Sequence, residues 1–154
     1  MWWSQLGIVG AHLLLCCILV YSENASVINY RLSNNIIPRA YLINIRVDLV
    51  KFKFDGSVSI ELMAEKKTSL IEVHQLDLNI GINISVLDEK LNPTKVKDTN
   101  YIKESQILQI HLEKPLIARQ VYDVKIMFDG NITDDMTGLY RSPQYENNVV
   151  KLVF

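Results

Sequence analysis

The sequence predicts an all-β protein, either an antiparallel β-sandwich or a curved two-layer sheet, incomplete at its C-terminus. Short segments alternate apolar and polar residues with a period of two, and turns rich in Gly, Pro, Asn and Asp separate them. No segment has a convincing apolar stripe at the 3.6-residue helical period. The length of 154 residues allows one domain with a substantial core. The formal net charge of −1 excludes a basic field for nucleic acid.

Alternation begins shortly after Pro38. Residues 41–49 place apolar side chains on one face and polar side chains on the other, as in a half-buried strand. We expect a tight turn at Asp55-Gly56 and a second strand over 58–62. Residues 69–73 form a short apolar run. A further alternating segment is predicted over 76–86.

The second half continues the pattern. Residues 88–100 are charged and aperiodic, which indicates a loop at the end of a hairpin. A strand is predicted over 107–112, closed by Lys114-Pro115, and another over 122–128. Residues 149–154 open a last strand whose end lies outside the sequence.

The first residues have a different character from the rest. Residues 6–21 are almost wholly apolar, but the run is shorter than the roughly 20 residues that span a bilayer. We expect residues 1–22 to be a cleaved signal peptide, although no Lys or Arg precedes the run; an uncleaved signal anchor is the alternative. Residues 23–35 are then a polar, flexible lead-in, and residues 36–154 form the β-domain.

Cysteines and sequons fit a secreted protein. Cys16 and Cys17 both lie in the predicted signal peptide, so the mature chain has no thiol or disulfide. Three Asn-x-Ser/Thr sequons begin at Asn24, Asn83 and Asn131. These features predict an N-glycosylated protein of the secretory pathway, located outside the cell or on the outer surface of the plasma membrane.

The three histidines do not form a recognisable metal-binding motif. His12 lies in the signal segment, whereas His74 and His111 each lie in a strand pattern with a glutamate two residues away. These two would ligate a metal only if their strands were adjacent, and polar residues on the outer face of a sheet are the more common case. The sequence contains no His-Glu-x-x-His, no Gly-x-Ser-x-Gly, no Gly-rich phosphate loop and no Cys pair outside the leader.

Asp134 and Asp135 are adjacent carboxylates in a predicted turn. They would suit a calcium ion or an acid/base couple, but such residues more often bond to nearby backbone amides. Arg141 follows closely, and an ion pair with one of the carboxylates would give it a structural role.

Residues 128–142, with Tyr145 just beyond, form the most specific motif. Its defining positions are Gly130, Asp135, Met136, Gly138, Tyr140, Arg141 and Ser142. This motif resembles the signature late in the N-terminal β-domain of zinc aminopeptidases of the aminopeptidase N (gluzincin) family. Other landmarks occur in family order, at Tyr30-Arg31-Leu32, Pro38, Tyr41, 54–60 and 74–80, although Ser33 stands where proline is usual. The signal peptide and sequons resemble those of the animal branch, in particular insect-type midgut enzymes.

The resemblance implies a full-length enzyme that removes N-terminal residues from peptides. Its zinc would be held by a His-Glu-x-x-His helix and a downstream glutamate, and its substrate amine by a Gly-x-Met-Glu-Asn segment. These motifs are absent here, and the amine-binding residue of the β-domain would fall just beyond Phe154. We therefore expect this chain to lack catalytic and metal residues, to be inactive alone, and to partner the catalytic domain of the same polypeptide.

One alternative stays open. The chain would instead be a short secreted β-sandwich that binds a partner without catalysis. The transcript beyond the codon for Phe154 distinguishes the two, because continuation into the zinc motifs favours the enzyme and an in-frame stop favours the binding module.

Overall fold

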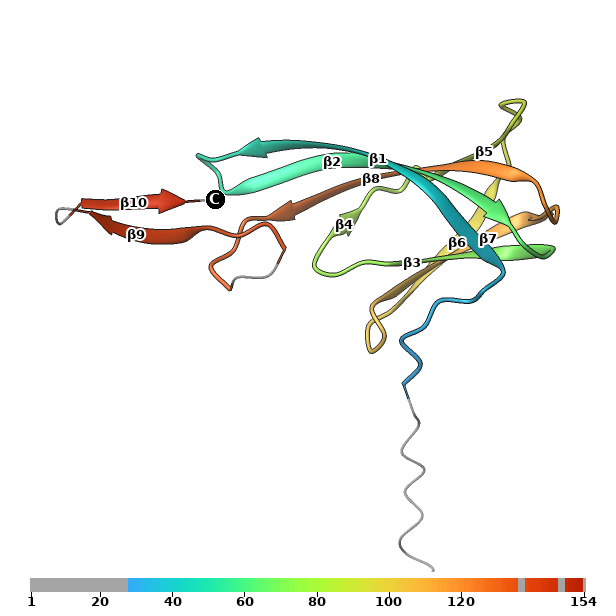
Figure 1. The fold of residues 1–154 in the computed structure, drawn as a ribbon, viewed down its shortest axis with the longest axis horizontal. Coiled ribbons are helices and arrows are strands. Elements are labelled where there is room, and N and C mark those ends of the chain that lie inside the picture. The colour runs from blue at the N-terminus through green and yellow to red at the C-terminus, as the bar shows by residue number, and fades with distance from the viewer. Residues whose placement is uncertain (1–27, 136–137, 147–148, 154) are drawn as a thin grey trace, which may run out of the picture.

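The computed structural model describes residues 28–135, 138–146 and 149–153. These residues form ten β-strands and no helix, and the paired strands run antiparallel (Figure 1). The predicted all-β, antiparallel fold class is therefore confirmed.

Two sheets face each other, and a separate hairpin follows. The larger sheet has the order β1-β2-β8-β4, with β5 also paired to β8. Its strands are β1 (Ile36–Asp48), β2 (Lys53–Ala64), β8 (Val121–Asn131), β4 (Asn79–Ile80) and β5 (Ser85–Asp88). The smaller sheet contains β3 (Thr68–His74), β7 (Ile107–Leu116) and β6 (Val96–Ile102), in that order. The hairpin consists of β9 (Ser142–Glu146) and β10 (Val149–Val153).

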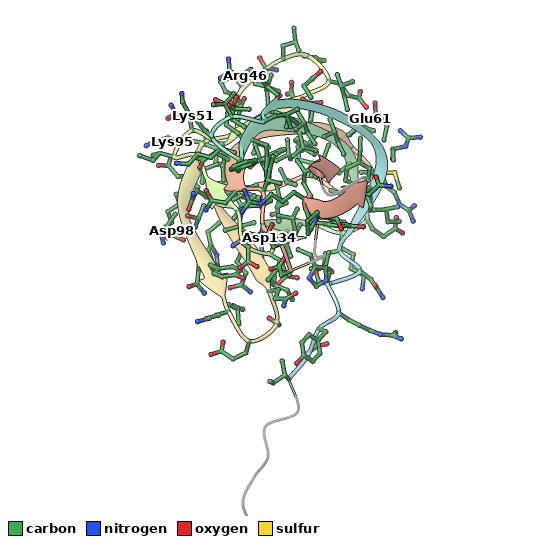
Figure 2. All side chains as sticks on the ribbon, turned by 90° about the vertical axis from the view of Figure 1, so that its left-hand side faces the viewer. Arg46, Lys51, Glu61, Lys95, Asp98 and Asp134 are labelled. Atoms are coloured by element: carbon green, nitrogen blue, oxygen red, sulfur yellow. The ribbon has the colours of Figure 1, made fainter. Side chains whose placement is uncertain are left out.

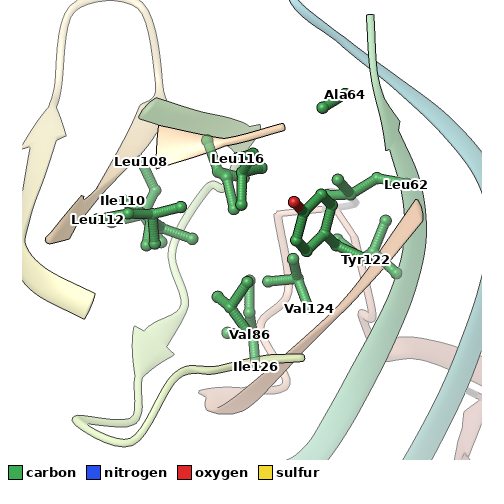
Figure 3. Close-up of a cluster of buried hydrophobic side chains, with 12 residues drawn as sticks. Leu62, Ala64, Val86, Leu108, Ile110, Leu112, Leu116, Tyr122, Val124 and Ile126 are labelled. Carbon is green, nitrogen blue, oxygen red and sulfur yellow. The ribbon is translucent and has the colours of Figure 1, made fainter. Parts of the chain in front are cut away.

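The core lies where the two sheets overlap. Ile60 on β2 lies opposite Val124 on β8, and Leu62 opposite Tyr122, so the period of two sends all four side chains to the same face. Residues of β7, including Ile110, meet them from the other sheet (Figure 3). Burial of each aliphatic side chain contributes about 1.5–3 kcal/mol.

Tyr122 is buried without leaving its hydroxyl unsatisfied. The hydroxyl accepts a hydrogen bond from the Ile117 amide at 2.9 Å and donates one to Gln120 Oε1 at 3.2 Å. Because a buried polar group without a partner costs stability, these bonds allow an aromatic ring at this core position. Charged residues such as Arg46 and Glu61 lie on the outside of the sheets (Figure 2).

The expected turn at Asp55-Gly56 is wrong. β2 runs through both residues, and the turn between β1 and β2 lies at 49–52. The Asp48 carboxylate accepts hydrogen bonds from the Val50 and Lys51 amides, and Phe52 has a φ of 53°. The strands are therefore longer than the Asp-Gly signal predicted, because Asp48, upstream of Asp55, closes the turn instead.

Contacts with neighbouring strands leave no room for a side chain at Gly56. Across β2 and β8, Phe54 lies opposite Gly130 and Phe128 lies opposite Gly56. The two rings meet edge to face, with centroids 6.4 Å apart. A Cβ at Gly130 would lie 2.5 Å from Phe54 Cζ, and one at Gly56 would lie 3.0 Å from Phe128 Cζ and collide with the Asn44 carbonyl oxygen.

Three other sequence predictions need correction. The segment 76–86 is not one strand, because Asp77 has a φ of 53° and β4 and β5 are separate. The segment 88–100 is only partly a loop, since β6 begins at Val96. Strand β7 passes through Pro115 and ends at Leu116, where the sequence predicted closure at Lys114-Pro115.

The lead-in, expected to be flexible, is fastened at its C-terminal end. The Ser33 amide donates to Glu72 Oε2 at 3.0 Å, and the Asn35 carbonyl accepts from the Glu65 amide at 2.8 Å. The predicted signal peptide (1–22) lies outside the described residues, so the domain boundaries of the sequence analysis stay predictions.

Candidate functional site

The signature segment begins where β8 ends and is attached to the β1–β2 turn. The Ile132 amide donates to the Phe52 carbonyl at 2.8 Å, and the Ile132 side chain is buried. The Arg141 amide donates to the Thr133 carbonyl at 2.9 Å, so the two ends of the loop meet. The loop therefore has a fixed base, from which the β9–β10 hairpin continues.

Arg141 makes the predicted ion pair, and its partner is Asp134. The guanidinium bonds through Nε and Nη2, with Nη2 3.0 Å from Asp134 Oδ2, and stacks 4.0 Å from the centre of the Phe52 ring. The bond from Arg141 lowers the pKa of Asp134, and the same bond raises the pKa of Arg141. Asp135 accepts a hydrogen bond from the Thr133 hydroxyl.

These bonds occupy both carboxylates within the loop itself. The donors in these bonds are the side chains of Arg141 and Thr133, and the interpretation of Asp134 and Asp135 as turn residues bonded to backbone amides stays a prediction. Among the residues that the structure describes, no three His, Cys, Asp or Glu side chains lie close enough together to hold a metal ion.

The remaining signature residues lie at different places along the loop and its flanking strands. Gly138 has a φ of 64°, a left-handed conformation that favours glycine. Gly130 lies under the Phe54 ring, Tyr140 is exposed, and Ser142 begins β9. Met136 lies outside the described residues.

The two described histidines lie on adjacent strands but far apart along them. His74 lies opposite Ile107, whereas His111 lies opposite Leu70. That offset of four residues corresponds to about 13 Å at the rise of a strand. His111 Nε2 lies 3.9 Å from Asp98 Oδ1 across β6 and β7. The two histidines that the structure describes do not fit a catalytic zinc site together, and His12 lies outside the described part.

The sequence analysis did not predict an apolar groove that the structure shows between the two sheets. A groove of about 570 Å³ opens between the two sheets and is lined mainly by apolar side chains of β1, β2, β8 and β3. Its lining also includes the polar residues Glu72, His74 and Gln75. The alternation in 41–49 identified the apolar face of β1 correctly, but no pattern in the sequence says whether such a face is covered.

Two of the three sequons have side chains in the described part, and both are exposed. Asn83 lies between β4 and β5, and Asn131 is the last residue of β8. Asn24 lies outside the described residues. No helix among the described residues has the length and apolar character needed to cross a membrane.

The facing sheets and the anchored loop define a domain of the β-sandwich class. A family model described as the peptidase M1 N-terminal domain matches residues 37–154. The chain therefore belongs to the M1 peptidase family, in which this stretch is an N-terminal domain of an aminopeptidase.

Individual relatives agree with the family match. Aminopeptidase N of the rabbit, Oryctolagus cuniculus, is 30% identical over 134 residues, which is 80% of this chain. Aminopeptidase N of the dog, Canis lupus familiaris, is 28% identical over 135 residues, or 81% of the chain. A puromycin-sensitive aminopeptidase of Caenorhabditis elegans is 28% identical over 111 residues, or 72% of this chain and 12% of the relative. The chain spans about 14% of the length of the curated aminopeptidase N relatives it matches. The insect-like branch stays a prediction.

Proposed function

We propose that this chain is the N-terminal structural domain of a zinc-dependent aminopeptidase that removes N-terminal residues from peptides. The observation that carries this proposal is the family match over residues 37–154, together with the 14% share of each aminopeptidase N relative that the matched stretch spans. M1 peptidases are in general zinc enzymes. The zinc and the hydrolysis belong, in this proposal, to the rest of the polypeptide, and the chain alone is inactive.

In this proposal the domain has a structural role, and the catalytic residues lie in the rest of the polypeptide. The Arg141–Asp134 pair and the Phe52 contact hold the signature loop, and the loop sets the start of the β9–β10 hairpin. Rigid elements of this kind can hold neighbouring parts of a binding site in place. In this proposal the domain packs beside the catalytic domain and helps to enclose the cavity that receives the peptide substrate.

The experiment compares two secreted products. The complete transcript and this chain are expressed in animal cells, and both are assayed on an aminoacyl-coumarin substrate with and without a zinc chelator. We expect chelator-sensitive release of the amino acid from the longer product and none from the chain alone. Activity in the chain alone, or an inactive and zinc-free longer product, would overturn the proposal.

We also propose that the protein passes through the secretory pathway to the cell exterior or the outer face of the plasma membrane. Its support is the apolar leader and the exposure of Asn83 and Asn131. Treatment with peptide N-glycosidase should shift the secreted product on a gel. Replacing each of Asn24, Asn83 and Asn131 by Gln should remove that shift stepwise.

A short secreted binding module is the second candidate, and the apolar groove is the observation that favours it. An in-frame stop after the codon for Phe154, with a stable secreted product of this size, would select it over the aminopeptidase domain.

A further inference from the structure

Another groove lies at the edge of the sandwich where the chain crosses from β5 in the larger sheet to β6 in the smaller one (Figure 1). This groove, the Asn83 groove, holds about 520 Å³ and is lined by the segments 82–86 and 93–96. It is separate from the apolar groove beside β1, because β2 and β8 lie between β1 and β5 in the larger sheet.

The segment 93–96 forms a fixed wall of the Asn83 groove. The Thr94 amide donates to the Val86 carbonyl at 2.8 Å, which attaches the segment to β5. The Glu113 amide donates to the Lys95 carbonyl at 2.9 Å, which attaches it to β7. The wall is therefore bonded to both sheets.

The floor of the Asn83 groove is the edge of the hydrophobic core. Val86 is 1% exposed and belongs to the core, and Ile84 and Val96 are partly buried against it. Ile82 at the rim is 100% exposed, and Pro93 on the other segment is exposed as well. Apolar surface thus continues from the core to solvent at this edge. A ligand that covers it would remove apolar area from water and stabilise the domain.

The lining has the chemical character that suits a sugar ring. A pyranose presents C–H groups on its faces and hydroxyl groups around its rim, and the lining combines aliphatic side chains with the hydroxyl groups of Ser85 and Thr94. Lys95 is the charged residue among these described residues, and its Nζ is already paired with Glu113 Oε1 at 2.6 Å. The groove therefore favours a neutral polar ligand over an anion.

Asn83 can supply such a ligand covalently. It begins the sequon Asn83-Ile84-Ser85, is exposed, and itself lines the groove. An N-glycan begins with N-acetylglucosamine on the side-chain amide, so its first ring starts at the rim of the groove. A tethered ligand has an effective concentration in the millimolar range, so a weak intrinsic affinity is enough to fill the site. The bulk of the glycan also keeps macromolecules away from this edge.

We propose that the Asn83 groove seats the first N-acetylglucosamine of a glycan on Asn83, and that this sugar covers the β5–β6 edge of the core. The ring packs on Ile82 and Pro93, and its polar groups bond to the Thr94 hydroxyl. The inference rests on the proposed passage through the secretory pathway, because that passage supplies the glycan. The glycan on Asn83 is then a structural part of the domain.

Hydrogen exchange of the complete secreted protein tests the seating. The protein is produced in animal cells treated with kifunensine, so that endoglycosidase H trims each glycan to a single N-acetylglucosamine. The fully glycosylated protein, the trimmed protein and Asn83→Gln are compared. Amides of 84–86 and 94–96 should exchange equally slowly in the first two and about two- to tenfold faster in Asn83→Gln. Protection that requires the whole glycan, or equal exchange in all three, would overturn the inference.

Two sets of variants control for local and general effects. Asn131 is absent from the lining, so Asn131→Gln should leave exchange at 84–86 and 94–96 unchanged. Ser85→Thr keeps the sequon and should retain slow exchange, whereas Ser85→Ala removes the sequon and should behave like Asn83→Gln. Equal losses in the two Ser85 variants would assign the effect to β5 itself and would count against the glycan.

Ile82→Ser tests the packing of the sugar. Because Ile82 is 100% exposed, its replacement should not alter exchange in the Asn83→Gln background. In the glycosylated protein the same change should remove most of the protection, since the ring loses an apolar contact. The same effect in both backgrounds would show that Ile82 and the glycan are not coupled, and would contradict the proposed contact.

Mass spectrometry of the peptide that contains Asn83 separates this inference from the proposed function. An occupied Asn83 whose loss leaves exchange unchanged overturns the inference alone. A secreted protein that carries glycans elsewhere but none on Asn83 also overturns the inference alone. A protein without any glycan that stays inside the cell overturns both the inference and the proposed secretory route.

Discussion

Phe54 and Phe128 show how single residues shape the larger sheet. Each ring covers a glycine on the neighbouring strand, so the pair of β2 and β8 stays close-packed although two of its positions have no side chain. The sequence contains both glycines in contexts that indicate turns, and only the cross-strand register explains them as packing residues.

Substitution of these glycines should reduce stability to different degrees. Gly56→Ala and Gly130→Ala should each cost roughly 1–3 kcal/mol of the free energy of unfolding through overpacking. Gly56→Ala should cost more, because its Cβ meets the backbone oxygen of Asn44, whereas Gly130→Ala meets the tip of the Phe54 ring. Urea unfolding measures both. Phe54→Leu should reduce the cost of Gly130→Ala, and an unchanged cost in that background would show that the ring contact is not the cause.

Replacing Arg141 by lysine should loosen the signature loop. Arg141→Lys loses the two-point bond to Asp134 and the planar stacking on Phe52. We expect faster amide hydrogen exchange at Arg141 and the β9 residues, with unchanged exchange in β2. Arg119→Lys is the control, because Arg119 is 71% exposed and its pair with Glu65 lies at the surface. Equal effects of the two variants on the loop would exclude the proposed anchoring role.

Glu72 should make stability depend on acid pH. Burial raises the pKa of its carboxyl, but the bonds from Gln109 and the Ser33 amide outweigh burial, and His111 adds a favourable charge. The net pKa is lowered from 4.5, so its stabilisation is present above that pH and is lost as pH falls through the folded-state pKa. The melting temperatures of the parent and Glu72→Gln should therefore converge between about pH 7 and about pH 3. Glu61→Gln, on the outer face, should show no such convergence.

At the scale of elements, β1 and β7 have similar alternating sequences and opposite environments. Apolar residues of β7 are enclosed between the sheets, whereas those of β1 line the open groove. Alternation defines which face of a strand is apolar, but the neighbouring sheet decides whether that face is buried.

This difference should appear in matched substitutions within the chain alone. Ile110→Ala should cost about 2–5 kcal/mol, because Ile110 is fully buried and its truncation leaves a cavity. Ile45→Ala should cost less than about 0.5 kcal/mol, because half of the side chain already meets water. Chemical unfolding of both variants measures the two costs, and similar values would mean that the groove is closed in solution.

At the scale of the whole molecule, the chain presents a long apolar strand at the edge of a sheet. β1 pairs only with β2 among the described residues, and its groove face is exposed. Such an edge promotes association between chains.

We therefore expect concentration-dependent self-association of the chain alone, measured by sedimentation velocity. Ile43→Lys should reduce association more than Leu42→Lys, because only Ile43 lies on the groove face. A monodisperse monomer with a sharp two-state melt at high concentration would contradict this expectation.

Sequence alone determined the all-β class, the positions of most strands, the pairing of Arg141 with a neighbouring aspartate, and the family resemblance. These follow from local period, short-range charge spacing and motif order, all of which a linear chain contains. Tertiary structure alone decided that Gly56 is a packing glycine in a strand, that the lead-in is tied to Glu72, and that β1 faces an open groove with Gln75 inside it. Those facts depend on which strands become neighbours, and residues far apart in sequence meet only after the two sheets have formed.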